Sequence, residues 1–219
     1  MSTEVCHYRL SLRGKPVGSH TLSTSFRGRT ALLGAKLMVQ DRLLNGTVTQ
    51  ESKVHRDQFF SFSFQEKTVT GSDSRSFTVE FDWDDGLVKA TRGGGDSAAV
   101  PYVEALEDPL GLLYHIRNLG AADTSLRVPL LGKTVLVDRL GETTLEMVAG
   151  EQAAYAYVLK PGNSYLYVAT EPPHPILMMS QPFEGYHLDA QLVRIDEDEP
   201  APTEAPKRRR SSRRRRRKK

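Results

Sequence analysis

The residues with the clearest chemistry form the last stretch of the chain, residues 207–219, which holds eleven lysines and arginines and no carboxylate. Eight of these cations are arginines, whose planar guanidinium group donates hydrogen bonds in a fork that matches a phosphate. A run of like charges repels itself and has no apolar surface to bury, so we expect it to be disordered. The predicted binding residues are Lys207, Arg208, Arg209, Arg210, Arg213, Arg214, Arg215, Arg216, Arg217, Lys218 and Lys219.

The charge of the remaining chain has the opposite sign. The 219 residues include 30 Lys and Arg and 27 Asp and Glu, a net charge of +3. Because eleven of the cations lie in 207–219, residues 1–206 carry 19 cations against all 27 carboxylates, a net charge of −8. The sequence therefore describes an acidic body with a polycationic tail, and the tail favours partners that are polyanions.

Two partner classes fit such a tail. RNA or DNA would be bound by electrostatics, and without base reading, because residues 207–219 contain no aromatic side chain on which a base could stack. An anionic membrane surface would attract the same cations, at about 1 kcal/mol for each one near the surface. The tail alone does not separate these two interpretations.

Catalytic and metal-binding patterns are not found. The six histidines are scattered, and Cys6 has no second cysteine at metal-ligand spacing, so no metal site is predicted. No G-x-S-x-G elbow occurs, and the glycines at 93–95 open no helix that could hold a phosphate. We therefore expect a protein that is not an enzyme and that uses no cofactor.

Short runs with a two-residue rhythm, separated by Gly, Asn and Asp turns, dominate residues 5–195 and predict antiparallel β-structure. Asn45-Gly46 is the strongest hairpin signal among the turns. Tyrosines at 155, 157, 165 and 167 could line a ligand groove, although packing is the simpler account of tyrosine in strands. The predicted strands are Cys6–Leu12, Phe60–Phe64, Phe77–Trp83, Leu87–Ala90, Leu126–Leu130, Lys133–Leu140, Thr143–Val148, Ala153–Lys160, Tyr165–Thr170, Ile176–Ser180 and Tyr186–Ile195.

One helix is predicted at 108–119. Asp108 suits the N-cap, and Pro109 suits the first helical position because its missing N–H would have no partner there. Gly120 can end the helix. Apolar residues follow at helical spacing: Leu112, Leu113, Ile116 and Leu119.

These elements predict a mainly β protein in three parts. Residues 1–195 should form a curved antiparallel sheet or incomplete β-barrel, a β-clam, with the helix in its open side. Residues 196–206 carry five carboxylates and three prolines and predict a semi-extended acidic linker. Residues 207–219 form the polybasic tail.

Three segments carry a family resemblance: Tyr8–Gly18, Asp108–Arg117 and His174–Leu192. Through them the body resembles a bacterial family of β-rich domains of unknown function, similar in architecture to the β-clam of lipoprotein carriers. Members of the family are typically exported, and the resemblance implies an apolar groove between a curved sheet and a helix. This chain differs in its start, which lacks an apolar signal-peptide core, and in its added tail.

The sequence thus predicts a cytoplasmic protein, associated with the nucleoid or ribosomes, that binds RNA or DNA non-specifically through its tail. The lack of any run of 18 apolar residues and the single cysteine fit that location. The alternative is a carrier of an apolar small molecule or lipid, held at an anionic membrane by the tail. Oligomeric state is not indicated by the sequence.

Overall fold

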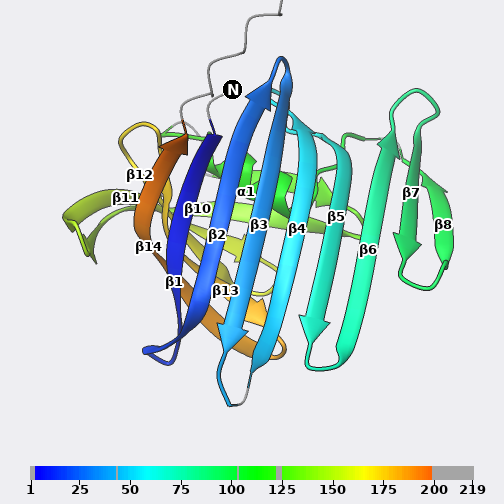
Figure 1. Ribbon diagram of the computed structural model, residues 1–219. Coiled ribbons are helices and arrows are strands. Elements are labelled where there is room, and N and C mark those ends of the chain that lie inside the picture. Colours follow the sequence, from blue (N-terminus) through cyan, green and yellow to red (C-terminus); the bar gives the residue numbers. More distant parts are fainter. Residues whose placement is uncertain (1–2, 43, 103, 122–124, 199–219) are drawn as a thin grey trace, which may run out of the picture.

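The computed structural model describes residues 3–42, 44–102, 104–121 and 125–198, so the tail and most of the expected linker lie outside the described residues. Within the described ranges the chain forms one antiparallel sheet of fourteen strands and one helix (Figure 1). The prediction of a mainly β fold with a curved, open sheet and a single helix is confirmed. The elements are β1 Thr3–Leu12, β2 Lys15–Arg27, β3 Thr30–Gln40, β4 Asn45–His55, β5 Ser61–Thr70, β6 Asp73–Asp82, β7 Leu87–Arg92, β8 Ser97–Pro101, α1 Pro109–Arg117, β9 Ser125–Leu130, β10 Lys133–Met147, β11 Gly150–Lys160, β12 Ser164–Ala169, β13 Ile176–Phe183 and β14 Tyr186–Asp198.

The order of strands in the sheet explains where the helix lies. Neighbouring strands follow the sequence, except that β1 pairs with β14, so the two ends of the sheet are β8 and β9. Helix α1 is the connection between these two edge strands. It lies inside the curve of the sheet, behind β2–β4 in Figure 1, and contacts β3 and β4. The helix therefore fills the side on which the sheet does not close.

Helix α1 begins as the sequence predicts. The Oδ1 atom of Asp108 accepts hydrogen bonds from the backbone N–H groups of Leu110 (2.8 Å) and Gly111 (3.0 Å), which makes Asp108 the N-cap. The helix ends at Arg117, two residues earlier than expected. Of its predicted apolar face, Leu112 and Ile116 are buried, whereas Leu113 is half-buried.

The helix divides the interior into two apolar clusters. The larger cluster lies among β1, β9–β14, the start of β2 and the end of β3. The smaller cluster lies against β3–β7. Leu112 and Ile116 belong to the larger cluster, while Leu110 and Tyr114 belong to the smaller one. Helix α1 thus packs against both clusters and connects the two halves of the sheet.

Two local predictions are wrong. Asn45-Gly46 lies in β4 rather than in a turn, and the chain reverses just before it, where the N–H of Asp41 donates to the carbonyl of Leu44 (2.8 Å). Glycine is needed at 46 because a Cβ there would lie 2.9 Å from the carbonyl oxygen of Val69. Residues 133–147 form one strand, not two, because the pairing with β11 continues past an irregularity at residues 139–141.

Strand β14 continues three residues past 195. Asp196, Glu197 and Asp198 pair with the first residues of β1. The Oδ2 atom of Asp196 lies 2.9 Å from Nη2 of Arg194 and 3.0 Å from Nε2 of His7. Part of the segment expected to be an acidic linker therefore extends the sheet, and Asp196 has charge partners there.

His20, on the inner face of β2, makes the stability of the fold depend on pH. The side chain is buried, and this burial lowers its pKa to about 4. In the unfolded chain the pKa is about 6.5, so below that pH the unfolded state binds a proton that the folded state excludes. We expect about 3 kcal/mol of the free energy of unfolding to be lost as the pH falls from about 7 towards 4.

Urea unfolding at several pH values measures this loss. The His20→Gln variant should show a smaller decline in the free energy of unfolding between pH 7 and 4. His187 is exposed, and the His187→Gln variant is the matched control that should follow the wild type. An equal decline in all three proteins would show that His20 is not the group responsible.

Candidate functional site

The structure describes the chain as far as Asp198, before the linker and the tail, and does not describe the cations of the tail. All eleven predicted binding residues, from Lys207 to Lys219, lie outside the described residues. The last described residue, Asp198, pairs with Thr3 at the start of β1. Lys207 lies nine positions after Asp198, a length of chain that spans at most about 30 Å. The chain thus leaves the described domain at a defined end of the sheet, the end at which β1 starts and β14 stops (Figure 1).

A cleft of about 450 Å³ opens at the same end, and we call it the tail-root cleft. Its walls come from β1, β2, the loop between β4 and β5, helix α1 and the loop between β12 and β13. Segments far apart in the sequence therefore meet there. The lining residues are Glu4, Thr24, Phe26, Arg56, Asp57, Phe59, Tyr114, Arg117, Asn118 and Pro173.

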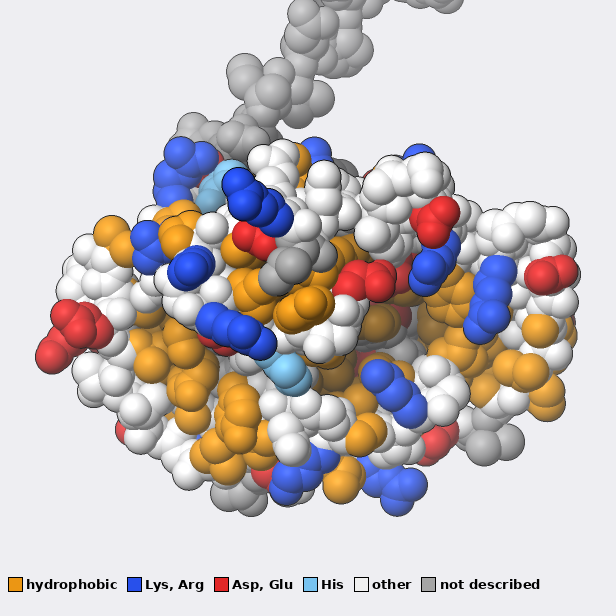
Figure 2. All heavy atoms as spheres, turned by 90° about the horizontal axis from the view of Figure 1, so that it is seen from below, with side chains coloured by type: hydrophobic (Ala, Val, Ile, Leu, Met, Phe, Trp, Pro, Cys, Tyr) orange, Lys and Arg blue, Asp and Glu red, His pale blue; other side chains and the backbone are white. Residues whose placement is uncertain are grey.

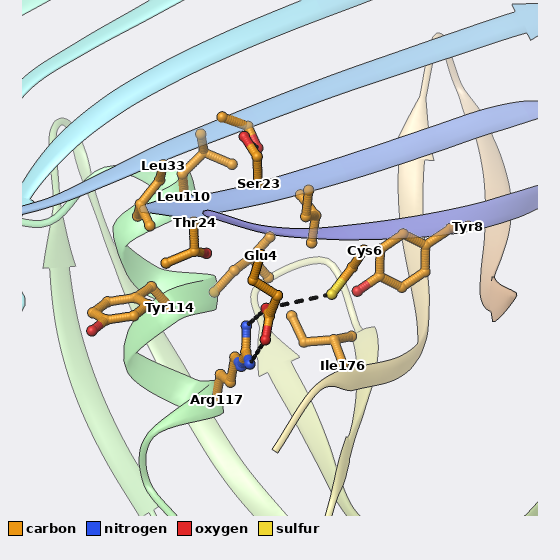
Figure 3. Close-up of a pocket in the computed structure, with 13 residues that line it drawn as sticks. Glu4, Cys6, Tyr8, Ser23, Thr24, Leu33, Leu110, Tyr114, Arg117 and Ile176 are labelled. Atoms are coloured by element: carbon orange, nitrogen blue, oxygen red, sulfur yellow. Dashed lines mark hydrogen bonds and ion pairs between the residues drawn. The ribbon is translucent and has the colours of Figure 1, made fainter. Parts of the chain in front are cut away.

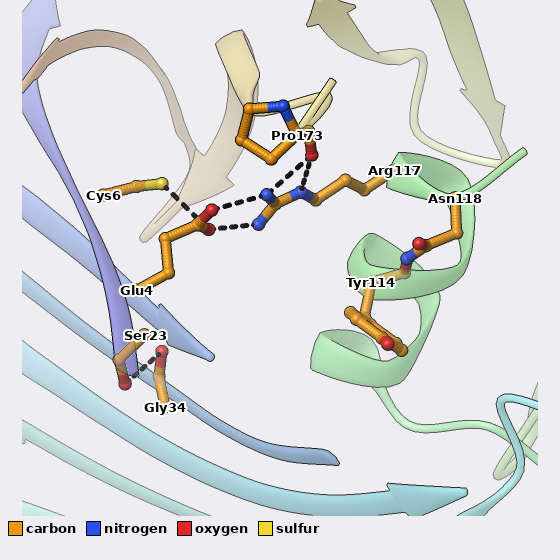
Figure 4. A network of polar contacts seen from close by, with 8 residues as sticks. All are labelled: Glu4, Cys6, Ser23, Gly34, Tyr114, Arg117, Asn118 and Pro173. Carbon is orange, nitrogen blue, oxygen red and sulfur yellow. Dashed lines mark hydrogen bonds and ion pairs between the residues drawn. The ribbon is translucent and has the colours of Figure 1, made fainter. Parts of the chain in front are cut away.

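Arg117 clamps three of these segments together (Figure 4). Its Nη2 donates to Oε2 of Glu4 (2.7 Å), and its Nη1 pairs with the other oxygen of the same carboxylate. Its Nε and Nη2 also donate to the backbone carbonyl of Pro173, at 3.2 and 2.8 Å. Such a bidentate pair with a further acceptor satisfies the guanidinium. Arg117 therefore fixes the shape of the cleft, and its charge is already neutralised by Glu4.

The floor beneath the clamp is apolar (Figure 3). Tyr8, Leu110 and Ile176 are buried there, and the free space among them is only about 30 Å³. Cys6 lies in this floor, where burial raises the pKa of its thiol to about 12. A thiol with so high a pKa stays protonated at neutral pH and is a poor nucleophile. The floor supports the cleft and offers no reactive group of its own.

Aromatic rings form one wall of the cleft. The ring of Phe26 lies 6.3 Å from that of Tyr114, and the ring of Phe59 lies 5.7 Å from Tyr114 in an edge-on arrangement. The guanidinium carbon of Arg56 lies 4.5 Å from the centre of the Phe26 ring, a cation–π contact. Arg56 is exposed and has no ion pair among the described residues.

The ring of Phe59 packs against a pair formed by His115, which is half-buried, and Glu107, which is buried. The Phe59 ring stacks on the His115 ring at 4.1 Å, with 12° between the planes, and Nδ1 of His115 lies 2.7 Å from Oε1 of Glu107. Glu107 is 7% exposed, and this burial raises its pKa. The backbone of Phe59 has a φ of +62°, a left-handed conformation that is rare for an aromatic residue. Its N–H donates to the carbonyl of His55 (2.9 Å), which holds the loop in that conformation.

A second hollow lies at the opposite end of the sheet, and we call it the distal groove (Figure 2). One part, of about 250 Å³, lies between β3–β5 and the turn after β13. The other part, of about 460 Å³, lies against β6 and β7 and includes Phe77, Arg75 and Arg92. Glu66 borders both parts and accepts a hydrogen bond from Nε2 of Gln50 (2.7 Å). Figure 2 shows apolar side chains recessed in the hollow at this end, with cations around it.

Comparison with known proteins identifies the fold and nothing finer. No protein-family model matches the sequence, and no curated protein matches it. The structure is similar to the crystal structure of a β-barrel-like protein of domain of unknown function DUF1849 from Brucella abortus, with a TM-score of 0.60. The two share a fold. The match covers 90% of this chain and 98% of the DUF1849 chain at 10% sequence identity, so the likeness concerns the fold alone.

The resemblance to a bacterial β-rich domain of unknown function is thereby confirmed at the level of architecture. Three of the four tyrosines of β11 and β12 pack against the larger apolar cluster: Tyr157 is buried, and Tyr155 and Tyr167 are partly buried against it, whereas Tyr165 is exposed. The guanidinium of Arg139 lies 4.2 Å from the ring centre of Tyr155. Among the described residues no cluster of three His, Cys, Asp or Glu could hold a metal ion. No helix in the described part of the chain is long and apolar enough to cross a membrane.

Sequence reasoning missed the tail-root cleft. Phe26, Arg56 and Tyr114 come from three separate segments, and no motif joins them in the sequence. The only local signal was the cluster Arg56–Phe60 between two strands, where a basic and an acidic residue precede two phenylalanines. Such a signal indicates a loop and not what the loop faces.

Proposed function

We propose that this protein is not an enzyme and that it binds nucleic acid, RNA or DNA, through the cations at 207–219, with little dependence on sequence. The observation that carries the proposal is the charge distribution, eleven cations in thirteen residues attached to a body of net charge −8. An acidic body repels phosphates, so attraction to a polyanion must come from the tail. Such a protein would work in the cytoplasm, close to the nucleoid or ribosomes.

The mechanism is the release of counterions. Each phosphate that a lysine or arginine neutralises frees a condensed cation, and the gain in entropy drives binding. Arginine adds hydrogen bonds to phosphate oxygens. Residues 199–206 connect the last described residue, Asp198, to the tail, so the folded domain is carried to the nucleic acid and does not have to contact it.

Purification with and without nuclease tests the proposal. The full chain, isolated at low salt, should carry nucleic acid that is removed by nuclease or by about 1 M salt, since screening at that concentration reduces electrostatic range to about 3 Å. Absorbance at 260 and 280 nm and gel analysis of the extracted material measure the outcome. Protein that is free of nucleic acid at low salt would contradict the proposal.

The distal groove favours a second candidate function, a carrier of an apolar small molecule or lipid held at an anionic membrane by the tail. The groove has an apolar side at Leu37, Val48 and Phe183 and a basic side at Arg75 and Arg92, which suits an amphiphile with an anionic head. Competition separates the two functions. Nucleic acid should displace the protein from anionic vesicles under the first proposal, whereas lipid should co-purify in the groove under the second.

A further inference from the structure

The tail-root cleft has an aromatic wall and an exposed guanidinium beside the place where the tail begins. We infer that this cleft takes a base of a single-stranded nucleic acid whose phosphates the tail holds. The inference rests on the proposed function, because the tail supplies the affinity that brings the strand to the body. It goes beyond that function by assigning a base-binding site to the folded domain.

The first step in the argument is position. Glu4, which lines the cleft, pairs in the sheet with Glu197, the residue before the last described one. Lys207 lies within about 30 Å of Asp198 by chain length. A strand held by the first cations of the tail can therefore reach the mouth of the cleft, whereas the distal groove lies at the other end of the sheet (Figures 1 and 2).

The second step is chemistry. Unpaired bases stack on aromatic rings and on the planes of arginine guanidinium groups. The cleft offers both, since Arg56 lies on the ring of Phe26 and the rings of Phe59 and Tyr114 stand beside it. Its volume of about 450 Å³ is within the usual range for small-ligand sites, about 300–1,000 Å³. The tail has no aromatic residue, so the body supplies the contact that the tail lacks.

The third step is charge. The clamp between Arg117 and Glu4 neutralises one cation and one anion of the lining, so Arg56 and Asp57 are the other charges at the cleft. These two charges offset each other, so the lining has no net charge, which suits an uncharged base. A purely polyanionic ligand would need more cations than this cleft provides, which favours a base over a bare phosphate as its occupant.

The fourth step is preorganisation. Phe59 keeps a left-handed backbone conformation, which is strained and persists where surrounding contacts enforce it. The hydrogen bond to His55 and the stack on His115 are those contacts, and the pair of His115 with the buried Glu107 fixes the supporting ring. The ring of Phe59 is therefore in place before any ligand binds.

Binding of the full chain to a single-stranded oligonucleotide, and to the duplex of the same sequence, tests the inference by fluorescence anisotropy. The Phe59→Ala variant should bind the single strand roughly 5- to 100-fold more weakly, the range that loss of one base–aromatic stack gives. It should bind the duplex as well as the wild type does, because duplex bases are already stacked. The salt slope of single-strand binding should not change, because no phosphate contact is lost.

Three further variants keep the test independent of folding. Arg56→Gln removes the exposed guanidinium without touching the core, and Arg29→Gln is its control, since Arg29 is exposed on the neighbouring hairpin and carries the same charge. Arg56→Gln should weaken single-strand binding at least 3-fold more than Arg29→Gln does. Phe62, whose ring packs against Phe60 away from the cleft lining, gives the control Phe62→Ala for the loss of a ring.

A base analogue reports the stack directly. The fluorescence of 2-aminopurine in the single strand should be quenched by the wild type and not by the Phe59→Ala variant. Equal losses on single strand and duplex, or no difference between Arg56→Gln and Arg29→Gln, would overturn the inference while leaving the tail's role intact. A dependence on Phe59 seen with phosphatidylglycerol vesicles and not with the oligonucleotide would overturn it in favour of a lipid headgroup. If the wild-type chain binds no nucleic acid at all, both the proposed function of the tail and the base-binding role of the cleft are wrong.

Discussion

Raising the salt concentration from about 50 to 200 mM should lower the affinity of the full chain for a mixed-sequence oligonucleotide by roughly 10³-fold. The estimate assumes that six to eight of the eleven tail cations contact phosphates at once, which gives a log–log slope of roughly −4 to −7, depending on whether the nucleic acid is single- or double-stranded. Anisotropy titrations at four or five salt concentrations measure the slope. This is the largest effect that the charge distribution predicts.

Two controls sharpen the titration. Replacing all eight tail arginines by lysine should keep most of the affinity and the slope, because non-specific attraction depends on charge more than on the guanidinium fork. Changing the base sequence of a duplex at constant length should change the affinity by less than about 3-fold, since phosphate contacts carry no sequence information. A slope near zero would show that binding, where it occurs, is not made by the tail.

The Asp108→Ala variant should lose about 3–5 kcal/mol of the free energy of unfolding, which would place it among the most damaging single substitutions in the body. Asp108 is 3% exposed, and its Oδ2 accepts hydrogen bonds from the hydroxyls of Ser52 (2.5 Å) and Ser61 (2.6 Å). Its Oδ1 accepts from the first turn of α1. Alanine would leave these buried donors without partners and remove the helix cap.

Urea denaturation compares the variants. Asp108→Asn should lose less than Asp108→Ala, because its amide oxygen can still cap the helix. Asp57→Ala is the matched control, since Asp57 is an exposed loop aspartate, and it should change the free energy of unfolding by less than about 0.5 kcal/mol. If Asp108→Ala unfolds within 1 kcal/mol of the wild type, the buried network around the helix start does not stabilise the fold as described.

Local signals account for the parts of this fold that could be predicted. The alternation Phe77, Val79, Phe81 fixes a strand because neighbouring side chains of a strand face opposite sides of the sheet. Asp108 and Pro109 fix the start of α1 for equally local reasons. The position of the helix between the two edge strands also follows from its place in the sequence, once the sheet is known to be open.

Long-range pairing accounts for what could not be predicted. Gly46 is a glycine because Val69 of the neighbouring strand approaches it, a contact that no local pattern reveals. Residues 196–198 look like a linker by composition, yet they complete the pairing of β14 with β1. The tail-root cleft depends on Arg117 reaching Glu4, 113 residues earlier in the chain. Such contacts exist only after the sheet has curled around the helix.

The central claim, that the tail makes the nucleic-acid contact, is tested most directly by comparing the full chain with a chain that ends at Ala205. Both are titrated against the same oligonucleotide at about 50 mM salt, where a tail with six to eight phosphate contacts has its greatest effect. We expect the shorter chain to lose at least 100-fold in affinity and to melt within a degree or two of the full chain, because residues 206–219 contain no side chain that could add to the apolar core. Undiminished binding by the chain that ends at Ala205 would contradict the account and place the nucleic-acid surface on the β-domain.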